Sequence, residues 1–158
     1  MKSVAAILLL AASALAQKGG AAKPTTGQLV GTWRLVSIED TMKDGVVKSP
    51  EQFGPHPLGF LMYEADGYMC ANIMNPDRPA WKDPAKATND EKIAYYGTYT
   101  LYAEQSIVTH YPVVAWTPAY VGSKQERPFK LEGNRLTISV TGPLPAVTKR
   151  VLVWERAE

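Results

Sequence analysis

Cysteine and histidine are scarce in this chain. Its 158 residues contain one cysteine, Cys70, and two histidines, His56 and His110. A single cysteine cannot form an internal disulfide, so the stability of the fold has to come from packing. A zinc site with so few sulfur and imidazole ligands would need carboxylates at suitable spacings, and the sequence offers none. We therefore expect no metal site.

The sequence motifs of common enzyme chemistries are also missing. There is no Gly-x-Ser-x-Gly elbow, no Ser-x-x-Lys, no phosphate-binding loop and no dinucleotide fingerprint. The acids nearest the second predicted hairpin, Asp66 and Asp77, fall in separate turns and do not form a carboxylate pair. We therefore expect no cofactor, and a binding protein is favoured over an enzyme.

The chain also lacks a charge bias and a long apolar run. It has 17 Lys and Arg against 15 Asp and Glu, scattered along the sequence, which gives no argument for binding nucleic acid or an anionic membrane. The longest apolar run, Val4 to Leu15, is about a dozen residues, whereas a membrane span needs about 20. Neither nucleic acid nor a membrane span is expected.

The N-terminus has the features of a signal peptide. Lys2 precedes the apolar run, and Ala14-Leu15-Ala16 supplies a small-x-small cleavage pattern. We expect residues 1–16 to be a signal peptide cleaved after Ala16, residues 17–27 to be a flexible leader, and residues 28–157 to form one domain. This organisation predicts a secreted or periplasmic protein.

Short runs of aromatic and β-branched residues, separated by turn residues, dominate the domain. Gly67 and Gly133 lie where tight hairpin turns need positive φ. This succession predicts an all-β fold, and a single antiparallel up-and-down barrel of about eight strands is favoured over an open sandwich, which would leave edges to protect. The predicted strands are 29–39, 58–64, 68–74, 97–103, 106–111, 127–131, 135–140 and 148–155.

Residues 75–96 interrupt this pattern. Three prolines exclude a regular strand there, and Thr88 to Glu91 has the form of a capping box, which predicts a short helix ending before Gly97. The segment is expected to act as a lid or a plug for the barrel, with Trp81 supplying apolar surface.

Two glycines precede large rings at the predicted start of a strand. Gly31 comes two residues before Trp33, and Gly97 comes two residues before Tyr99. Because glycine inside a strand marks a bend or a close backbone approach, both are expected to make room beside a ring.

The ordered set of motifs resembles the lipocalin-like domain of secreted and biosynthetic-cluster proteins, a distant relative of true lipocalins. The matching pieces are LVGTWRLVS, PLGFLMYEADGYM, MNPDRP, YYGTYTL, VTHYP, ERPFKLEGNRLTIS and LVWER. The resemblance implies a lipocalin/calycin-like barrel in which Arg156 packs across Trp33 at the closed end, with Gly31 letting the backbone pass. It also implies that His110 points inward. The chain is shorter than true lipocalins and lacks their disulfides.

Candidate ligand-binding residues are polar groups on the predicted strands. They are Tyr63, Asn72, Tyr99, His110 and Arg127. Alternation alone does not decide which face of these strands is internal, because both faces carry bulky side chains. Arg127 is expected to pair either with a ligand acid or with Glu132 or Glu155. A lone histidine on a strand, such as His110, is more often a hydrogen-bonded packing residue than a reactive group.

Three functions fit these observations. The first is a secreted protein that binds a small apolar or amphipathic molecule, and hence a small hydrophobic partner, inside the barrel. The second is a cofactor-free isomerase or cyclase acting on a small hydrophobic metabolite, with His110 as its catalytic residue. The third is a packed barrel that acts through its surface.

Overall fold

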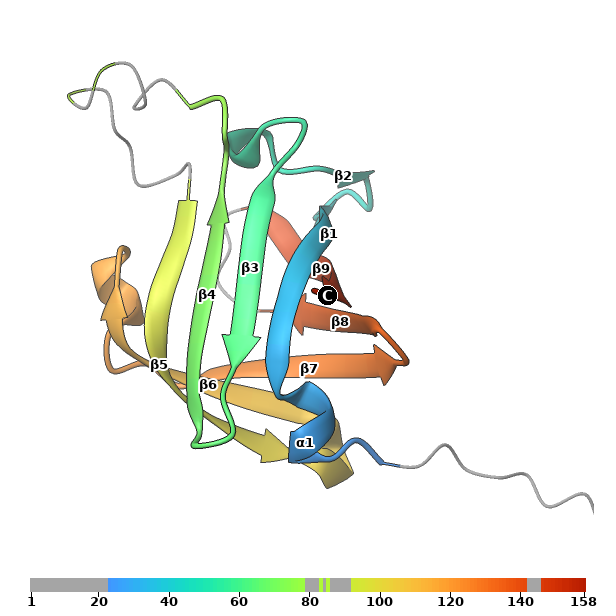
Figure 1. Ribbon diagram of the computed structural model, residues 1–158. Coiled ribbons are helices and arrows are strands. Elements are labelled where there is room, and N and C mark those ends of the chain that lie inside the picture. Colours follow the sequence, from blue (N-terminus) through green and yellow to red (C-terminus); the bar gives the residue numbers. More distant parts are fainter. Residues whose placement is uncertain (1–22, 79–82, 84, 86–91, 142–145) are drawn as a thin grey trace, which may run out of the picture.

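The computed structural model describes residues 23–78, 83, 85, 92–141 and 146–158, and the strands wrap around one interior (Figure 1). The elements, in chain order, are α1 (Thr26–Leu29), β1 (Gly31–Met42), β2 (Val47–Lys48), the 3-10 turn η1 (Glu51–Phe53), β3 (Leu58–Tyr63), β4 (Tyr68–Met74), β5 (Lys92–Tyr102), η5 (Ala103–Gln105), β6 (Ile107–Ala115), η6 (Pro118–Tyr120), β7 (Gln125–Glu132), β8 (Arg135–Val140) and β9 (Val147–Arg156).

Eight of these strands close into an antiparallel barrel. From β3 to β9 each strand pairs with the next along the chain, and β1 pairs with both β3 and β9. The short strand β2 is an addition that pairs with the far end of β1. The prediction of an up-and-down barrel of about eight strands is confirmed.

Hairpin turns and period-two burial set the register of the strands. Gly67 and Gly133 adopt φ of 90° and 57° in the β3–β4 and β7–β8 turns, as the turn residues predicted. Along β4 the buried side chains are Met69, Ala71 and Ile73, and the residues between them face outward. This alternation directs one set of side chains into the barrel.

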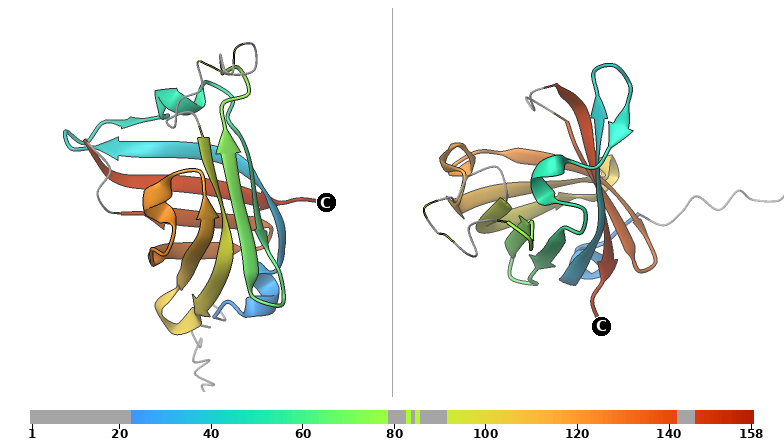
Figure 2. Two further views of the ribbon diagram at one scale, coloured as in Figure 1. Left: turned by 90° about the vertical axis from the view of Figure 1, so that its left-hand side faces the viewer. Right: turned by 90° about the horizontal axis from the view of Figure 1, so that it is seen from above.

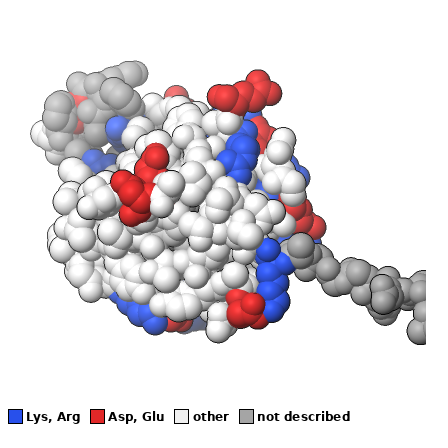
Figure 3. Space-filling model, turned by 60° about the horizontal axis from the view of Figure 1, so that its bottom comes forward, with Lys and Arg blue, Asp and Glu red and all other residues white. Residues whose placement is uncertain are grey.

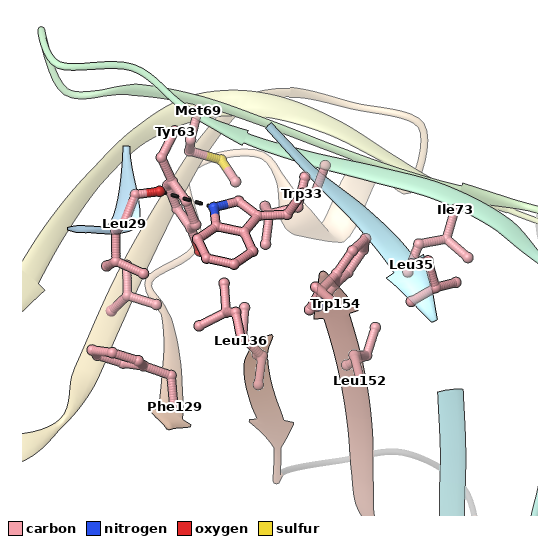
Figure 4. Close-up of a cluster of buried hydrophobic side chains, with 14 of the residues drawn as sticks. Leu29, Trp33, Leu35, Tyr63, Met69, Ile73, Phe129, Leu136, Leu152 and Trp154 are labelled. Atoms are coloured by element: carbon pink, nitrogen blue, oxygen red, sulfur yellow. Dashed lines mark hydrogen bonds between the residues drawn. The ribbon is translucent and has the colours of Figure 1, made fainter. Parts of the chain in front are cut away.

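One end of the barrel, the closed end, is sealed by Leu29 and Trp33, which Figure 4 shows side by side, and by Arg156. The fully buried indole of Trp33 donates from Nε1 to the Leu29 carbonyl over 2.9 Å. The Arg156 guanidinium carbon lies 4.2 Å from the indole centroid. Arg156 also donates to the carbonyls of Val30 and Gln28 over 2.8 and 2.6 Å, which ties the last strand to the first helical turn.

Gly31 makes this closure possible. Its φ is +126°, which L side chains rarely adopt, and a Cβ there would lie 2.6 Å from Nη1 of Arg156. The strand β1 begins at this bend, so Leu29, which we predicted as the first strand residue, lies in α1. The helix α1 begins two residues before the predicted domain start, and residues 1–22 lie outside the described part of the chain.

The prediction of a helix ending before Gly97 is wrong for the part that the structure describes. Residues 92–96 belong to β5, where they pair with β4, and this cross-strand pairing prevails over the local helix signal. The rest of the predicted helix and Trp81 lie outside the described residues.

Gly97 therefore lies inside a strand, and its role differs from that of Gly31. A β-bulge separates Tyr96 from Gly97, and a Cβ at Gly97 would lie 2.1 Å from the Tyr111 carbonyl oxygen. The glycine lets β5 and β6 approach closely where Pro112 interrupts the ladder. The register shift at the bulge accommodates Pro112, and pairing with β5 continues beyond it. The strand β6 therefore extends to Ala115, past its predicted end at Tyr111.

Candidate functional site

The central part of the barrel directs His110 inward. On β6, His110 pairs with Tyr99 of β5 and with Gln125 of β7, and Val108 pairs with Arg127. The imidazole is only 2% exposed. The structure thus gives His110 the inward orientation that alternation alone did not decide.

Two tyrosines hold the His110 ring. Its Nε2 lies 2.7 Å from the Tyr63 hydroxyl oxygen, and its Nδ1 lies 2.8 Å from the Tyr95 hydroxyl oxygen. A neutral imidazole has one donor and one acceptor nitrogen, so one tyrosine donates to the ring and the other accepts from it. Both ring nitrogens are therefore engaged within the protein.

Burial keeps these three groups uncharged at neutral pH. Desolvation, followed by the nearby positive charge of Arg127, lowers the pKa of His110 from 6.5 to about 3. Burial raises the pKa of Tyr95 to about 12 and that of Tyr63 well above its ordinary value, although the charge of Arg127 opposes both shifts. Because its charged form is strongly disfavoured, His110 is a poor general base in this state.

Arg127 is the half-buried cation beside this trio. Its guanidinium donates to Gln125 Oε1 and, over 3.2 Å, to the Glu126 carbonyl. Gln125 in turn donates to Ser123 Oγ over 3.1 Å, and Ser123 Oγ donates to the Tyr120 carbonyl over 2.7 Å. This chain of hydrogen bonds fixes Arg127 relative to η6.

No described carboxylate forms an ion pair with Arg127. Of the two protein partners that we considered, Glu132 pairs with Lys130 over 2.8 Å, and Glu155 pairs with Arg34. The ligand acid is the remaining possibility among the predicted partners.

A cavity of about 50 Å³ lies between this trio and the end of the barrel opposite Trp33, which we call the mouth end (Tyr120, Val140 and Arg150). In Figure 2, η1 and η6 lie at this end. Tyr120, Arg127 and Val140 line both the cavity and a surface groove of about 630 Å³. The cavity is lined mostly by apolar side chains: Leu61, Ala71, Ile73, Ile93, Tyr95, His110, Tyr120, Arg127, Ile138, Val140, Arg150, Leu152 and Trp154.

The second arginine of the cavity wall is neutralised. Arg150 donates to both carboxylate oxygens of Asp40, over 2.6 and 2.7 Å, and both residues are buried. The Arg150 guanidinium also lies 5.5 Å from the ring centroid of Phe53 in η1. This pair, which sequence reasoning missed, leaves Arg127 as the cavity arginine without an acid partner in the described part of the chain.

The predicted site residues divide into three groups. His110 and Arg127 line the cavity. Tyr63 and Tyr99 do not line it: Tyr63 lies behind His110 and is hydrogen-bonded to it. The Tyr99 ring centroid lies 4.7 Å from that of Tyr63, and the Tyr99 hydroxyl donates to the Glu64 carbonyl. Asn72 does not line the cavity: it follows buried Ala71 on β4 and faces outward, where it donates to Cys70 Sγ over 2.9 Å.

Three further residues of the site were missed as candidates. Tyr95 was not among the predicted ligand-binding residues, because its segment was predicted to be helical. Tyr120 gave no signal beyond being aromatic, and Trp154 entered only as part of the motif LVWER. Trp154 lines the cavity, and its buried Nε1 has no hydrogen-bond partner among the described residues.

The described residues contain neither a metal-binding cluster nor a helix that could span a membrane. Among the described residues no three His, Cys, Asp or Glu side chains are grouped so that they could hold a metal ion. In the same part of the chain, no helix has the length and apolar character to cross a membrane.

Comparisons with known proteins agree with the architecture. A search of curated proteins found no match. The family model described as the lipocalin-like domain matches residues 30–157, from the start of β1 to the end of β9. Closed barrels of this kind are suited to holding a small molecule. The match covers most of the chain, and the chain belongs to the lipocalin-like domain family.

Proposed function

We propose that this protein is a secreted lipocalin-like carrier that binds a small apolar or amphipathic molecule in the mouth end of its barrel. The observation that supports this proposal is the cavity, whose wall is apolar apart from a few polar groups. Ligand sites combine apolar walls with a small number of placed polar groups in this way. Export is inferred from the predicted signal peptide alone.

The size of the cavity sets a condition on binding. At about 50 Å³ it is smaller than the roughly 150 Å³ cavity that holds benzene in an engineered protein. A ligand therefore has to extend into the groove or displace part of the wall. Tyr120 and Arg127 lie between the cavity and the groove, so a shift of their side chains would join the two spaces.

The isomerase or cyclase hypothesis is less well supported by the geometry. Both nitrogens of His110 are bonded to tyrosines, so the imidazole cannot reach a substrate directly. Tyr95, which lines the cavity, would have to act in its place. We keep binding as the proposed function.

The test fills the cavity from within. Ala71 lines it, and Ala71→Val adds two carbon atoms to the wall. We expect 1-hexanol, titrated into the labelled protein, to shift the Trp154 indole N–H resonance of the wild type, and the variant to bind at least about tenfold more weakly. The urea midpoint should stay the same or rise, because filling a void restores packing contacts.

Ala94→Val is the matched control. Ala94 precedes Tyr95 on β5 and pairs with the outward-facing Asn72, so the added atoms lie on the outer face. This variant should bind hexanol like the wild type. Absence of a hexanol-induced shift in the wild type up to the solubility limit would contradict the proposal and favour a packed barrel acting through its surface.

The surface alternative has its own observation. Phe60, Tyr68 and Tyr96, on β3, β4 and β5, are each more than 40% exposed. Figure 3 shows a face on which charged side chains are few and a wide area is uncharged. A negative result with hexanol would direct attention to this face.

A further inference from the structure

We propose that the ligand of the barrel is a small monocarboxylic acid, whose carboxylate binds Arg127 and whose apolar part enters the cavity. This inference rests on the proposed function and adds the chemical class of the ligand. It is carried by the arrangement of hydrogen-bond donors around the cavity.

The charge around the cavity is unbalanced. Two arginines line it, and Asp40 neutralises Arg150 in a buried two-point contact. Arg127 forms no ion pair with a described carboxylate, and its hydrogen-bond acceptors on Gln125 and Glu126 are an amide oxygen and a carbonyl oxygen. The described wall therefore carries one uncompensated positive charge, which an anionic ligand would neutralise.

The hydrogen bonds of His110 add a second donor. Tyr63 is fully buried, and His110 Nε2 is the one acceptor recorded for its hydroxyl proton in the described structure. Tyr63 satisfies that proton by donating to Nε2, so Nδ1 carries the imidazole proton and donates to the Tyr95 oxygen. The Tyr95 hydroxyl proton then has no acceptor among the described residues. Because Tyr95 lines the cavity, this proton is available to a ligand there.

Trp154 supplies a third donor. The indole N–H can only donate, it is buried, and it has no acceptor in the described part of the protein. Its residue lines the same cavity as Tyr95 and Arg127. Buried donors are normally paired, so three donors with spare protons around one space favour an occupant with acceptor oxygens.

The position of Arg127 fixes the orientation of such a ligand. Arg127 lines both the cavity and the groove, and its hydrogen bonds through Gln125 and Ser123 hold it beside η6. A carboxylate accepts two parallel hydrogen bonds from a guanidinium. With the carboxylate there, a short chain reaches the apolar wall formed by residues such as Leu61, Ile73 and Leu152.

The experiment compares hexanoate with 1-hexanol, which have the same number of carbon atoms. At pH 7 and low salt we expect the wild type to bind hexanoate about ten- to 100-fold more tightly, as judged by shifts of the Trp154 indole resonance. Arg127→Met should abolish this preference, which is measured as the ratio of the hexanoate and hexanol affinities of the same variant. The preference should also decrease with added salt, because the contact lies near the surface.

Lys130→Met is the control for the loss of one positive charge. Lys130 lies on β7 like Arg127, but it is exposed and pairs with Glu132. This variant should keep the preference for hexanoate, and urea midpoints of both variants will show that they are folded.

Each outcome separates the two proposals. Equal affinity of the wild type for acid and alcohol would overturn the carboxylate inference and leave the binding function intact. A preference that survives Arg127→Met, or that Lys130→Met removes as well, would also overturn it. If neither compound binds, the proposed function itself fails.

Discussion

The two ends of this barrel are built on opposite principles. At the closed end, Trp33 is fully buried, its Nε1 is paired, and Arg156 satisfies two backbone carbonyls while it covers the ring. Toward the mouth end, the interior retains a cavity. Trp154 in the wall of this cavity has a buried N–H without a described partner, and Arg127 has no described acid partner.

This difference indicates where stability and recognition reside. Full satisfaction of polar groups and dense packing stabilise a fold, whereas a cavity and unpaired donors cost stability unless a ligand complements them. We therefore expect substitutions at the closed end to affect mainly unfolding, and substitutions at the mouth end to affect mainly binding.

The largest expected effect is at the closed end. Trp33→Ala should lower the free energy of unfolding by about 3 to 5 kcal/mol, as for other large buried aromatic residues. Arg156→Ala should lower the free energy of unfolding by less, because part of the Arg156 side chain is already exposed to water in the folded protein. Urea titrations of both variants test this. If Trp33→Ala unfolds at the urea midpoint of the wild type, the closed end is not the more stabilising end of the barrel.

The next effect concerns acid. The folded protein keeps His110 neutral down to about pH 3, whereas in the unfolded chain the ring takes up a proton near pH 6.5. The stability contributed by this group is complete above pH 6.5 and is lost as the pH falls towards 3, by up to about 1.4 kcal/mol per pH unit.

His110→Gln should remove this contribution. Between pH 6.5 and 4.5 the wild type should lose about 2 to 3 kcal/mol more than the variant, as measured by urea unfolding at each pH. His56→Gln, at an exposed loop position, should behave like the wild type. Parallel pH profiles for the wild type and His110→Gln would show that burial of the ring does not suppress its protonation.

A smaller effect is expected at the backbone bend of the closed end. Gly31→Ala should destabilise the fold by about 1 to 3 kcal/mol, because alanine is strained at φ of +126° and its Cβ would displace the Arg156 guanidinium. Gly27→Ala is the control, since α1 leaves open space at that position and alanine favours the helix. Thermal or urea unfolding of the two variants should therefore move in opposite directions.

The smallest effect is at the mouth end. Ser123→Ala removes the hydroxyl that links Gln125 to the Tyr120 carbonyl and so loosens Arg127. Hexanoate affinity should fall about three- to fivefold, with less than about 1 kcal/mol change in stability. Ser139→Ala, at a position on β8 between the cavity-facing residues Ile138 and Val140, is the matched control. A change in the urea midpoint without a change in affinity would assign Ser123 to packing.

The barrel was predictable because its signals are local. Apolar periodicity, turn glycines such as Gly67, and the Gly31–Trp33 pair all lie within short stretches of sequence. The family resemblance linked Trp33 to Arg156, which local pattern alone does not connect. The error at Lys92 to Tyr96 arose because a capping-box pattern is also local, whereas the strand that forms there depends on pairing with β4 and β6.

The site was less predictable because it depends on register and on distant partners. Successive residues of β4 face opposite sides of the sheet, so Asn72 faces outward while its neighbours Ala71 and Ile73 line the cavity. The Asp40–Arg150 pair joins residues 110 positions apart, and no motif announces it. The spare proton of Tyr95 follows only from the burial of Tyr63 on another strand.

The pairing of β1 with β9 also has a consequence for how the chain folds. Arg34 and Glu155 meet across this seam although they are 121 positions apart in sequence. Contacts of such long range form slowly, because a large loop must close before they stabilise anything. Until β9 joins, β1 and β8 each present an unpaired edge that can recruit another chain. Completion of the C-terminal strand is therefore the step at which the folding chain stops being vulnerable to aggregation.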